Sequence, residues 1–461
     1  MSDSFTKALS LALEQTSPVM RTQRASVTRP EELFALYTSE GDNARRDESR
    51  FIWDMHNGDQ LRYIPRLPGE SAGEFLRRPH KQFLNITRVV IDVLSQLYRR
   101  PVERTFETSD RARERIQRVY SRNPMDRLML GIDRMTRLQG VGAVRVSYEN
   151  GEVRYWPWPA HRLVVLPDFD RPDSPSAVVA FAAGDGSLAH VWSPWRVSTV
   201  AGGRILSEQE HGLGCVPFVF VHDRLPVDGF WVEGRGRGVA YANTEFNAKL
   251  SELAHTVAMQ GFGVMEIVNP DPNQEIAIGP ARAISFNVSG HEPFGVNFKS
   301  PNAPISDLIA DLEFLLRTLL KTQRIPESVL SVNVGANISG VSVLAQQTPV
   351  LEDRVERQQV FRAFEQELLD TTLAVLREHE GLHGEVGIHV NYPEPMLEQN
   401  AAERMSVDDW RLRHGMTTPW ALMYRDDPDG FTDLESARQA WETNLAALRA
   451  SQGQTGESSH D

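Results

Sequence analysis

Cysteine is almost missing from this sequence: Cys215 is the single one among 461 residues, which excludes a disulfide within the chain. Cys215 opens the apolar stretch 215–221, where burial raises the pKa of a thiol, so an inert core thiol is favoured over a nucleophile. A lone cysteine is typical of a protein that stays in a reducing compartment.

Long apolar runs are also missing. None approaches the ~18 residues needed to cross a bilayer, so no contact with a membrane is predicted. The first residues lack a basic segment followed by an apolar one, and therefore do not resemble a secretory signal. We expect a soluble, intracellular protein.

Catalytic and metal-binding motifs are absent from the sequence as well. The 13 histidines form no H-E-x-x-H pattern and no C-x-x-C occurs, so zinc-type spacing is missing. Residues 339–342 contain serine and glycine but form no G-x-S-x-G elbow and have no base beside them. The glycine-rich segment 234–238 lacks the Gly-Lys-Ser/Thr ending of a phosphate loop, which favours a flexible joint before a helix. We predict no catalytic residue, no metal and no cofactor.

Positive charge is in deficit. The chain has 49 lysines and arginines against 62 aspartates and glutamates, a net charge of −13. Binding along a phosphate backbone needs clustered cations that release counterions, so any nucleic-acid role must be loose or local. Asp307 and Asp311 lie four residues apart, a spacing that fits a solvated helix face or a negatively charged channel wall, and we favour the solvated face.

Length and composition indicate an ordinary globular protein. At roughly 150 residues per domain, the chain has room for about three structural units. Its 32 glycines and 27 prolines are close to average amounts, which excludes a collagen-like or low-complexity chain.

The first strongly helical pattern begins at Asn85 and is expected to end at Pro101. One face of this helix is predicted to be core: Ile86, Val89, Val90, Val93, Leu94 and Leu97. Another helix is predicted over 124–138. Residues 141–232 then alternate as strands do, with a hairpin that turns at 149–152, which predicts mostly antiparallel β-sheet.

Two long helices with a β-containing insert between them are predicted next. The first follows the segment 234–238, ends at Gly261, and has this apolar stripe: Phe246, Leu250, Leu253, Ala254, Val257 and Ala258. Pro304 opens the second, whose stripe is the clearest in the chain: Ile305, Leu308, Ile309, Leu312, Leu315, Leu316, Leu319 and Leu320. The insert at 262–300 is expected to project from the helix ends.

The last third of the sequence is predicted to be mainly helical. Residues 323–338 lose the helical period and have the small, polar composition of a mobile loop. A third long helix follows over about 339–376, and Pro349 should kink it. Residues 397–450 indicate two or three polar helices, and the tail 451–461 is expected to be disordered. The whole pattern predicts an α+β fold.

The order of these parts resembles the portal proteins of long-tailed double-stranded DNA phages, over about residues 50–450. Four segments carry the resemblance. The first two are the helix from Asn85 ending in Tyr98-Arg99-Arg100-Pro101-Val102 and the helix–β–helix block at 238–322. The third is Arg324-Ile325-Pro326-Glu327, followed by Ile338-Ser339-Gly340-Val341-Ser342 and the proline-containing helix, and the fourth is a late acidic helix ending His414-Gly415-Met416-Thr417-Thr418.

The resemblance implies a function and a set of partners. Portal proteins form a ring of identical subunits, commonly twelve, at one vertex of the capsid, through which double-stranded DNA is packaged and later ejected without sequence specificity. The partners it implies are further copies of the chain, the terminase large subunit, the head-tail adaptor, and the major capsid and scaffold proteins. The protein would lie in the virion and, during assembly, in the host cytoplasm.

The resemblance also implies a division of the chain. The parts are an N-terminal α/β wing (1–235), a first stem helix (236–260), a clip (261–300), a second stem helix (301–322), a tunnel loop (323–338), a proline-kinked helix with the wing return (339–396), a helical crown (397–450) and a disordered tail (451–461).

Three sets of site residues follow from this division. The tunnel loop and DNA channel are assigned Lys321, Arg324, Ser331, Asn333, Val334 and Asn337. Packing of the stem helices is assigned to Leu250, Leu253, Leu308, Leu312, Leu316 and Leu319. Clip contacts with terminase and adaptor are assigned to Asn269, Asp271, Asn273 and Glu275. Lys321 and Arg324 would also stabilise the negative end of their helix dipole, so that role and a positive ring in the channel both stay open.

Two other hypotheses remain. A nucleic-acid-processing enzyme of mixed α+β fold would need a phosphate loop or metal cluster that the sequence does not contain. A different head-tail connector protein would lack the two long stem helices. Substitution of Leu312, Leu316 and Leu319 is expected to abolish ring assembly under the portal hypothesis and only to unfold a monomer under the others.

Overall fold

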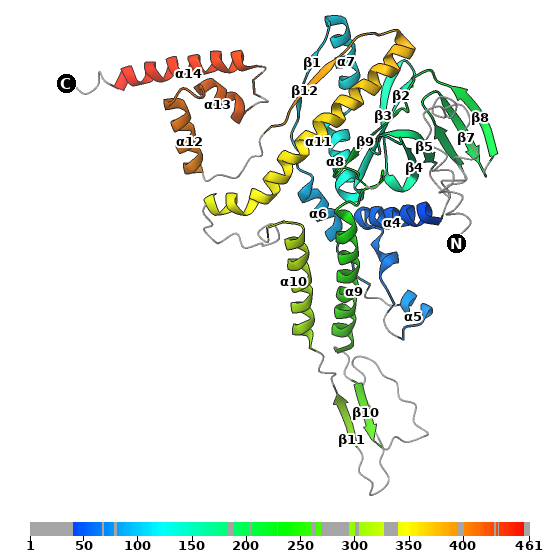
Figure 1. Cartoon of the computed structure of the whole chain (residues 1–461). Helices are drawn as coiled ribbons and strands as arrows, with labels where there is room; N and C mark the ends of the chain where they lie inside the picture. The colour runs from blue at the N-terminus through cyan, green and yellow to red at the C-terminus, as the bar shows by residue number, and fades with distance from the viewer. Residues whose placement is uncertain are drawn as a thin grey trace. The chain divides into compact units, whose positions relative to one another are not determined.

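The computed structural model describes residues 40–66, 69–77, 81–182, 188–202, 204–227, 229–260, 264–268, 295–299, 304–326, 340–393, 401–427, 430–431 and 433–455. These residues form helices and antiparallel strands, which confirms the predicted α+β class (Figure 1). The chain divides into two compact units, residues 1–331 with 349–393 and residues 332–348 with 394–461. Within the described ranges, no helix is long and apolar enough to cross a membrane.

The helices and strands have the following bounds. The helices are α4 (Glu40–Asn57), α5 (Ala72–Arg77), α6 (Ile86–Leu94), α7 (Asp110–Arg122), α8 (Met125–Gln139), α9 (Gly236–Gln260), α10 (Ile305–Thr322), α11 (Gly340–Glu380), α12 (Ala401–Arg413), α13 (Pro419–Asp426) and α14 (Leu434–Thr455), with short 3-10 helices η3 (Gln60–Tyr63) and η4 (Ala160–Arg162). The strands are β1 (Glu103–Glu107), β2 (Val141–Glu149), β3 (Glu152–Trp158), β4 (Leu163–Pro167), β5 (Pro175–Phe181), β6 (Leu188–Trp192), β7 (Arg196–Ala201), β8 (Arg204–Glu210), β9 (Phe218–His222), β10 (Val264–Val268), β11 (Gly295–Lys299) and β12 (Gly387–Asn391).

The helix predicted after Asn85 forms, but it is shorter than expected. Asn85 caps α6 by accepting a hydrogen bond from the backbone N–H of Arg88 at 2.9 Å. The helix ends at Leu94, well before Pro101, and the chain after it remains in the core, because Leu97 and Tyr98 are buried in a cluster with residues of α8 and α11. Val89, predicted as core, is 48% exposed, so that part of the predicted stripe is wrong.

The C-terminal boundaries differ in one place. Helix α14 continues through Thr455, past the boundary predicted at 450, and residues 456–461 lie outside the described residues. Pro349 lies inside α11, where the two compact units divide, and the kink expected there stays a prediction.

Two antiparallel sheets form the body of the first unit, with strand orders β3-β2-β9 and β4-β5-β6-β7-β8. The predicted hairpin is confirmed: β2 and β3 pair from Glu149 opposite Glu152. Its two turn residues, Asn150 and Gly151, have φ of 54° and 82°. Two successive positive φ angles match the type I′ turn that suits the strand twist, and Asn-Gly is the usual sequence for it.

In the five-stranded sheet, β4 and β5 are buried on both faces by simple alternation, whereas β8 is mostly exposed. Leu163 and Val165 of β4 pack toward β2 and β9, in a cluster with Phe218 and Phe220. Val164, between them, points to the opposite face and packs with neighbours from β5, β6 and β7. The two sheets therefore share a core, and the larger sheet has a second core of its own.

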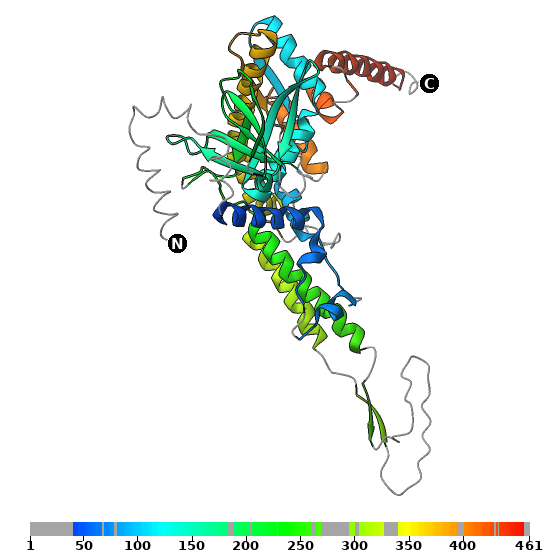
Figure 2. The ribbon, with the colours of Figure 1, turned by 90° about the vertical axis from the view of Figure 1, so that its right-hand side faces the viewer.

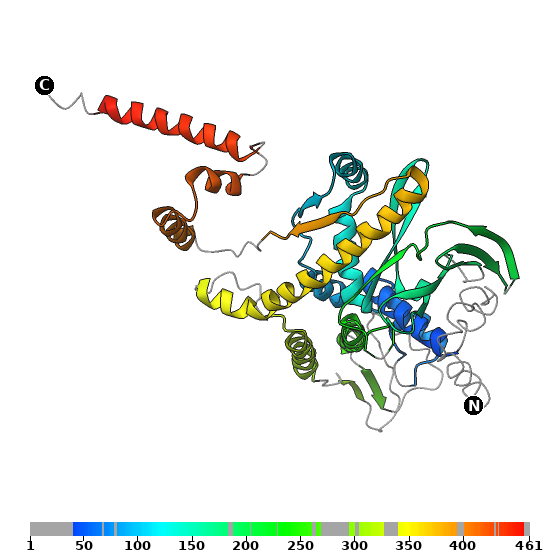
Figure 3. The ribbon, with the colours of Figure 1, turned by 45° about the horizontal axis from the view of Figure 1, so that its top comes forward.

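Helix α11 lies against the smaller sheet and supplies much of the main core. Phe361, Phe364 and Leu368 are buried in one cluster with residues of α8, β2, β3 and β9. Figure 3 shows α11 and the following strand β12 side by side. The side chain of Gln366 of α11 also binds β12, because its oxygen accepts a hydrogen bond from the backbone N–H of Ile388 at 3.1 Å. Strand β12 in turn pairs with β1.

A buried carboxylate fixes α11 to the strands beside it. Glu365 is fully buried and accepts hydrogen bonds from Tyr98 at 2.8 Å and from Arg104 at 2.6 Å. Arg104 also contacts Asp126 at 2.8 Å, and Tyr98 contacts Tyr392 at 3.0 Å. A buried carboxylate is tolerated only when paired in this way, so α11 has one permitted position along β1 and β12.

The two long helices α9 and α10 lie side by side and run in opposite directions, with the β10–β11 ribbon between them in the chain (Figures 1 and 2). Leu312 and Leu319 of α10 are buried, and Leu319 packs in a cluster with residues of α6 and α9. Lys249 of α9 contacts Asp311 of α10 at 2.5 Å. Asp311 therefore joins the helices and is not merely a solvated residue. Ile309, predicted in the apolar stripe, is 44% exposed because α9 covers only one side of α10.

Polar side chains on α9 hold the segment before α6 against that helix. Asn243, Asn247 and Ser251 are four residues apart and so share one face. Asn247 accepts a hydrogen bond from the backbone N–H of Leu84 at 2.9 Å, and Asn243 donates a hydrogen bond to the backbone carbonyl of Leu84 at 2.8 Å. Ser251 contacts both backbone groups of Gln82 at 3.1 Å. The buried face of α9 is thus partly polar, which its apolar stripe did not predict.

Glycines allow the start of α9 to touch the end of α8. A Cβ on Gly234 would lie 2.2 Å from the backbone nitrogen of Gly140, and one on Gly236 would lie 2.2 Å from the carbonyl oxygen of Leu138. Gly140 itself has φ of 84° and caps α8. The segment 234–238 was expected to be a flexible joint, but two of its glycines serve close backbone contact.

Replacing Gly236 by alanine is expected to destabilise the protein by about 1–3 kcal/mol, because the new methyl group has no space. Gly238 supplies the matched control. Nothing lies within 4 Å of a Cβ at that position, and alanine is the better helix former, so Gly238→Ala should be neutral or stabilise by up to about 1 kcal/mol. Urea unfolding of both variants measures the difference, and equal effects would contradict the close-contact explanation.

Candidate functional site

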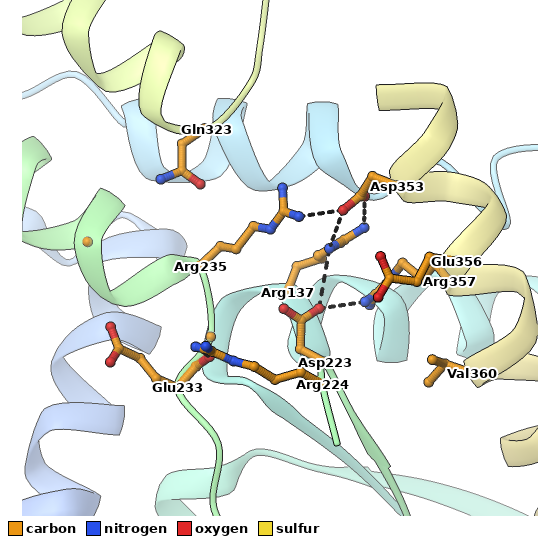
Figure 4. A pocket seen from close by; sticks show the side chains of 12 residues that line it. Arg137, Asp223, Arg224, Glu233, Arg235, Gln323, Asp353, Glu356, Arg357 and Val360 are labelled. Carbon is orange, nitrogen blue, oxygen red and sulfur yellow. Dashed lines mark hydrogen bonds and ion pairs between the residues drawn. The ribbon is translucent and has the colours of Figure 1, made fainter. Parts of the chain in front are cut away.

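Six charged side chains meet where α8 and β9 end, α9 begins and α11 passes, next to the end of α10, and Figure 4 shows all of them except Asp133. We call this group the charged junction; it consists of Asp133, Arg137, Asp223, Arg235, Asp353 and Arg357. It joins segments that are far apart in the sequence, and all of them belong to the first compact unit.

Arg357 of α11 is one of two buried cations of the junction, with 5% of its surface exposed against 3% for Arg137. Its Nε donates to Asp133 Oδ1 at 2.5 Å, and one Nη donates to the backbone carbonyl of the same residue at 3.0 Å. The other Nη donates to Asp223 Oδ1 at 2.6 Å. Asp133 is fully buried on α8, so this arginine supplies the charge that lets the carboxylate stay there.

Arg137 and Arg235 extend the network to the start of α9. Arg137, in the last turn of α8, contacts Asp223 at 3.3 Å and binds Asp353 with its guanidinium fork. Arg235 directly precedes α9 and contacts the same carboxylate, Asp353 of α11. Figure 4 shows Asp353 between these two guanidinium groups. Helix α11 is thereby bound both to α8 and to the first turn of α9.

Burial acts on both inner arginines, with different outcomes. It lowers the pKa of Arg137, and the nearby charge of Arg357 lowers it further, against the opposite effect of Asp223 and Asp353. Burial also opposes the charge of Arg357, but the carboxylates of Asp133 and Asp223 outweigh it and raise the pKa of that guanidinium. With three arginines and three aspartates, the junction is neutral as a whole.

Two polar cavities adjoin the junction. One has a volume of about 410 Å³ and is lined by junction residues together with Arg224, Glu233, Gln323 and Glu356. The other, of about 480 Å³, is lined by Arg235, Thr322, Gln323, Arg324, Glu352, Asp353 and Glu356. The end of α10 therefore meets the same acidic stretch of α11 that the junction uses.

The chemistry of the junction is structural. Each junction carboxylate is paired with a guanidinium, so none is placed to act as a general base. Among the described residues, no group of three or more His, Cys, Asp or Glu side chains is arranged to hold a metal ion. Cys215 is half-buried and burial raises the pKa of its thiol, as its apolar surroundings predicted. The arrangement is suited to holding helices in register.

The end of α10 has an unusual backbone. Arg324 has φ of 58°, in the left-handed region where glycine is the usual residue. The N–H of Arg324 bonds to the carbonyl of Lys321 at 3.1 Å, and the N–H of Ile325 bonds to that of Leu320 at 2.9 Å. These two bonds form a Schellman cap, closed by the buried Ile325. An arginine in the strained position of this cap is a candidate functional residue.

The structure places the predicted site residues as follows. Lys321 lies in the last turn of α10 and Arg324 just after it, both exposed. On the stem helices, Leu312 and Leu319 are buried, while the partly buried residues are Leu250, Leu253, Leu308 and Leu316. The remaining predicted residues lie outside the described residues: Ser331, Asn333, Val334, Asn337, Asn269, Asp271, Asn273 and Glu275.

Sequence reasoning missed the whole charged junction. A signal was present at two of its members, because each is a charge on an apolar helix face. Arg357 lies four residues before the buried Phe361, and Asp133 lies four residues after the buried Met129. Asp223 and Asp353 had no such signal, since their partners come from distant segments.

Replacing Arg357 by methionine is expected to destabilise the protein by about 3–5 kcal/mol, because Asp133 would keep a buried charge without a partner. The control is Arg317→Met. Arg317 forms an exposed pair with Glu313 at 3.3 Å, and losing it should change stability by less than about 0.5 kcal/mol. Urea unfolding at neutral pH compares the two variants, and similar effects would contradict the role given to the junction.

No family model and no curated protein matches this chain. Solved structures that match this chain include a chain of the neck of an empty gene transfer agent particle, at 13% identity and TM-score 0.38, covering 76% of this chain and 90% of that one. A chain in the virion of the native gene transfer agent particle is 13% identical at TM-score 0.36, covering 80% and 89%. An HK97-family phage portal protein from Corynebacterium diphtheriae is 12% identical at TM-score 0.30, covering 70% and 94%. All three similarities are distant, with TM-scores below 0.5.

Proposed function

We propose that this chain is a phage portal protein, which forms a homo-oligomeric ring at one capsid vertex and serves as the conduit for DNA packaging and ejection. The observation that carries the proposal is the block α9–β10–β11–α10, in which two long paired helices enclose a β ribbon in the chain. This is the stem and clip arrangement that the sequence resemblance implies, followed by the long proline-containing α11.

Exposed apolar side chains on the stem helices support assembly into a ring. Phe314 and Ile309 of α10 are 68% and 44% exposed, and Val257 of α9 is 48% exposed. Apolar side chains left uncovered on a helix pair are typical of a surface buried in an assembly. A head-to-tail contact between identical subunits closes into a ring when its rotation divides the circle.

Charge fits the passage of DNA. Each subunit has a net charge of −13, so a ring of such subunits would repel phosphates over most of its surface and let DNA slide. Lys321 and Arg324, at the end of α10, would then form a local positive ring beside the tunnel loop at 323–338. The left-handed backbone of Arg324 costs about 1–2 kcal/mol relative to glycine, which supports a role for its charge.

The partners follow from the same proposal. Terminase and the head-tail adaptor would bind the clip at 261–300, and capsid and scaffold proteins would surround the ring in the virion. The protein would have no enzymatic activity, and the energy of packaging would come from a separate ATPase.

The portal proposal predicts assembly into a ring. Light scattering of the purified protein should give a mass of about twelve times 51.9 kDa, and negative-stain images should show rings with a central hole. Ile309→Ser with Phe314→Ser should reduce the mass to that of a monomer without unfolding it. Leu312 and Leu319 are unsuitable for this test, because they are buried inside the subunit.

Phe169→Ser with Leu225→Ser is the matched control, since both side chains are strongly exposed and neither residue belongs to α9 or α10. This variant should form rings as the wild type does. A wild-type protein that stays monomeric at high concentration and in the presence of scaffold would contradict the portal proposal, and a nucleotide-hydrolysis assay would then test the enzyme alternative.

A substitution at Arg324 distinguishes the effect of its charge from the effect of its backbone conformation. Arg324→Gly relieves the strained backbone, so the melting temperature should be unchanged or slightly raised while the positive ring loses one charge per subunit. Particles assembled with this variant should retain shorter DNA, and Arg324→Lys should restore wild-type length. Unchanged DNA length in the glycine variant would remove Arg324 from the channel.

A further inference from the structure

Helix α7 carries a row of arginines that the proposed conduit does not use. Arg111, Arg115, Arg118 and Arg122 are spaced i, i+4, i+7 and i+11, so they lie along one face over about 16 Å. We call these four residues the α7 arginine stripe. It is an unusual concentration of cations in a chain whose net charge is −13.

The core fixes which face of α7 points outward. Ala112, Ile116 and Val119 are buried, with at most 3% of their surface exposed, and the last two belong to the apolar clusters beneath the helix. Each of these three residues directly follows an arginine of the stripe, so the stripe lies along the edge of the buried face. The helix cannot rotate to hide the stripe without exposing these three apolar residues.

One arginine of the stripe anchors the helix. Arg115 binds Glu380, at the end of α11, with two hydrogen bonds of 2.8 and 2.6 Å. Tyr148 of β2 donates to the same carboxylate at 3.0 Å. The hydrogen bonds from Arg115, together with the charges of Arg115 and Arg118, lower the pKa of Glu380. The stripe is therefore held in place by a contact that uses only one of its four charges.

The other three arginines are exposed and form no ion pair with the described part of the chain. Arg154 of β3 adds a further cation at one end, because it donates to the backbone carbonyl of Arg122 at 3.2 Å. The charged residues of α7 and those bonded to it have an excess of positive charge. The cations are Arg111, Arg113, Arg115, Arg118, Arg122 and Arg154, and the acids are Asp110, Glu114, Glu152 and Glu380, which leaves an excess of two positive charges.

We propose that the α7 arginine stripe binds the phosphate backbone of double-stranded DNA without reading its sequence. A guanidinium fork matches the oxygens of a phosphate, and a DNA strand repeats its phosphates at regular short intervals, as a rigid row of arginines requires. The source of the DNA rests on the proposed portal function, but the stripe and its chemistry do not.

The test compares two triple variants of the full-length protein. Arg111→Gln, Arg118→Gln and Arg122→Gln remove the free charges and keep the anchor Arg115. Arg171→Gln, Arg196→Gln and Arg204→Gln, all on or beside the five-stranded sheet and all exposed, change the net charge by the same amount. Fluorescence anisotropy with a labelled 30-base-pair duplex at 50 to 200 mM salt measures the affinity of each protein.

Sequence-independent phosphate contacts make the logarithm of affinity fall linearly with the logarithm of salt, with a slope of about −0.9 per contact. The stripe variant should therefore bind more weakly at 50 mM salt, with a slope shallower by about 2 to 3, for duplexes of any sequence. The control variant should keep the wild-type slope. Equal slopes for the two variants, or no binding by the wild type at 50 mM salt, would overturn the proposal.

Light scattering on the same samples separates this inference from the portal proposal. Rings that bind DNA equally with and without the stripe would overturn the inference alone. Stripe-dependent binding by a protein that never forms rings would support the inference and contradict the portal proposal. A stripe variant with normal DNA binding that is excluded from assembled capsids would show that the stripe contacts an acidic protein instead, which also overturns the inference.

Discussion

The ion pair between Arg357 and Asp133 is the constraint on which the arrangement of the first unit depends. A fully buried carboxylate is stable only when its charge is matched, and the guanidinium that matches it comes from α11, far away in the sequence. Since Arg357 also binds Asp223, α11 has one permitted register against α8 and β9. Apolar packing alone would tolerate a helix that slides, because leucine and phenylalanine contacts are not directional.

The position of α11 also determines the position of α9. Asp353 lies one turn before Arg357 on α11 and binds Arg235, which directly precedes α9. At the same place, Gly234 and Gly236 bring the chain into backbone contact with the end of α8. The direction of α9 is therefore fixed by both charge and close approach. A shift of α11 near Asp353 would therefore move the start of α9 and the end of α10, and the cavities beside the junction leave space for such a shift.

Local patterns predicted what is locally determined. The hairpin turn at Asn150 and Gly151, α8 and the leucine-rich α10 were all visible from periodicity and turn residues. Patterns failed where a distant segment decides the outcome: Val89 is exposed because no partner covers that face, and Asn243 is buried because it bonds to a remote backbone. The charged junction was missed for the same reason. Periodicity reports which face of a helix is buried, but it does not identify the partner.

The arginines of this acidic protein have two physical roles that salt separates. Arg137 and Arg357 of the charged junction are buried and paired, so mobile ions screen them little and their contribution to stability should persist in high salt. Arg111, Arg118 and Arg122 of the α7 stripe are exposed, so ions compete with any phosphate they bind. Contacts with a polyanion can therefore weaken or strengthen with the surroundings while the register of α8, α9 and α11 stays fixed. A surface that bound phosphates through its structural arginines would have to loosen its own core to release them, and the separation of the two roles avoids this.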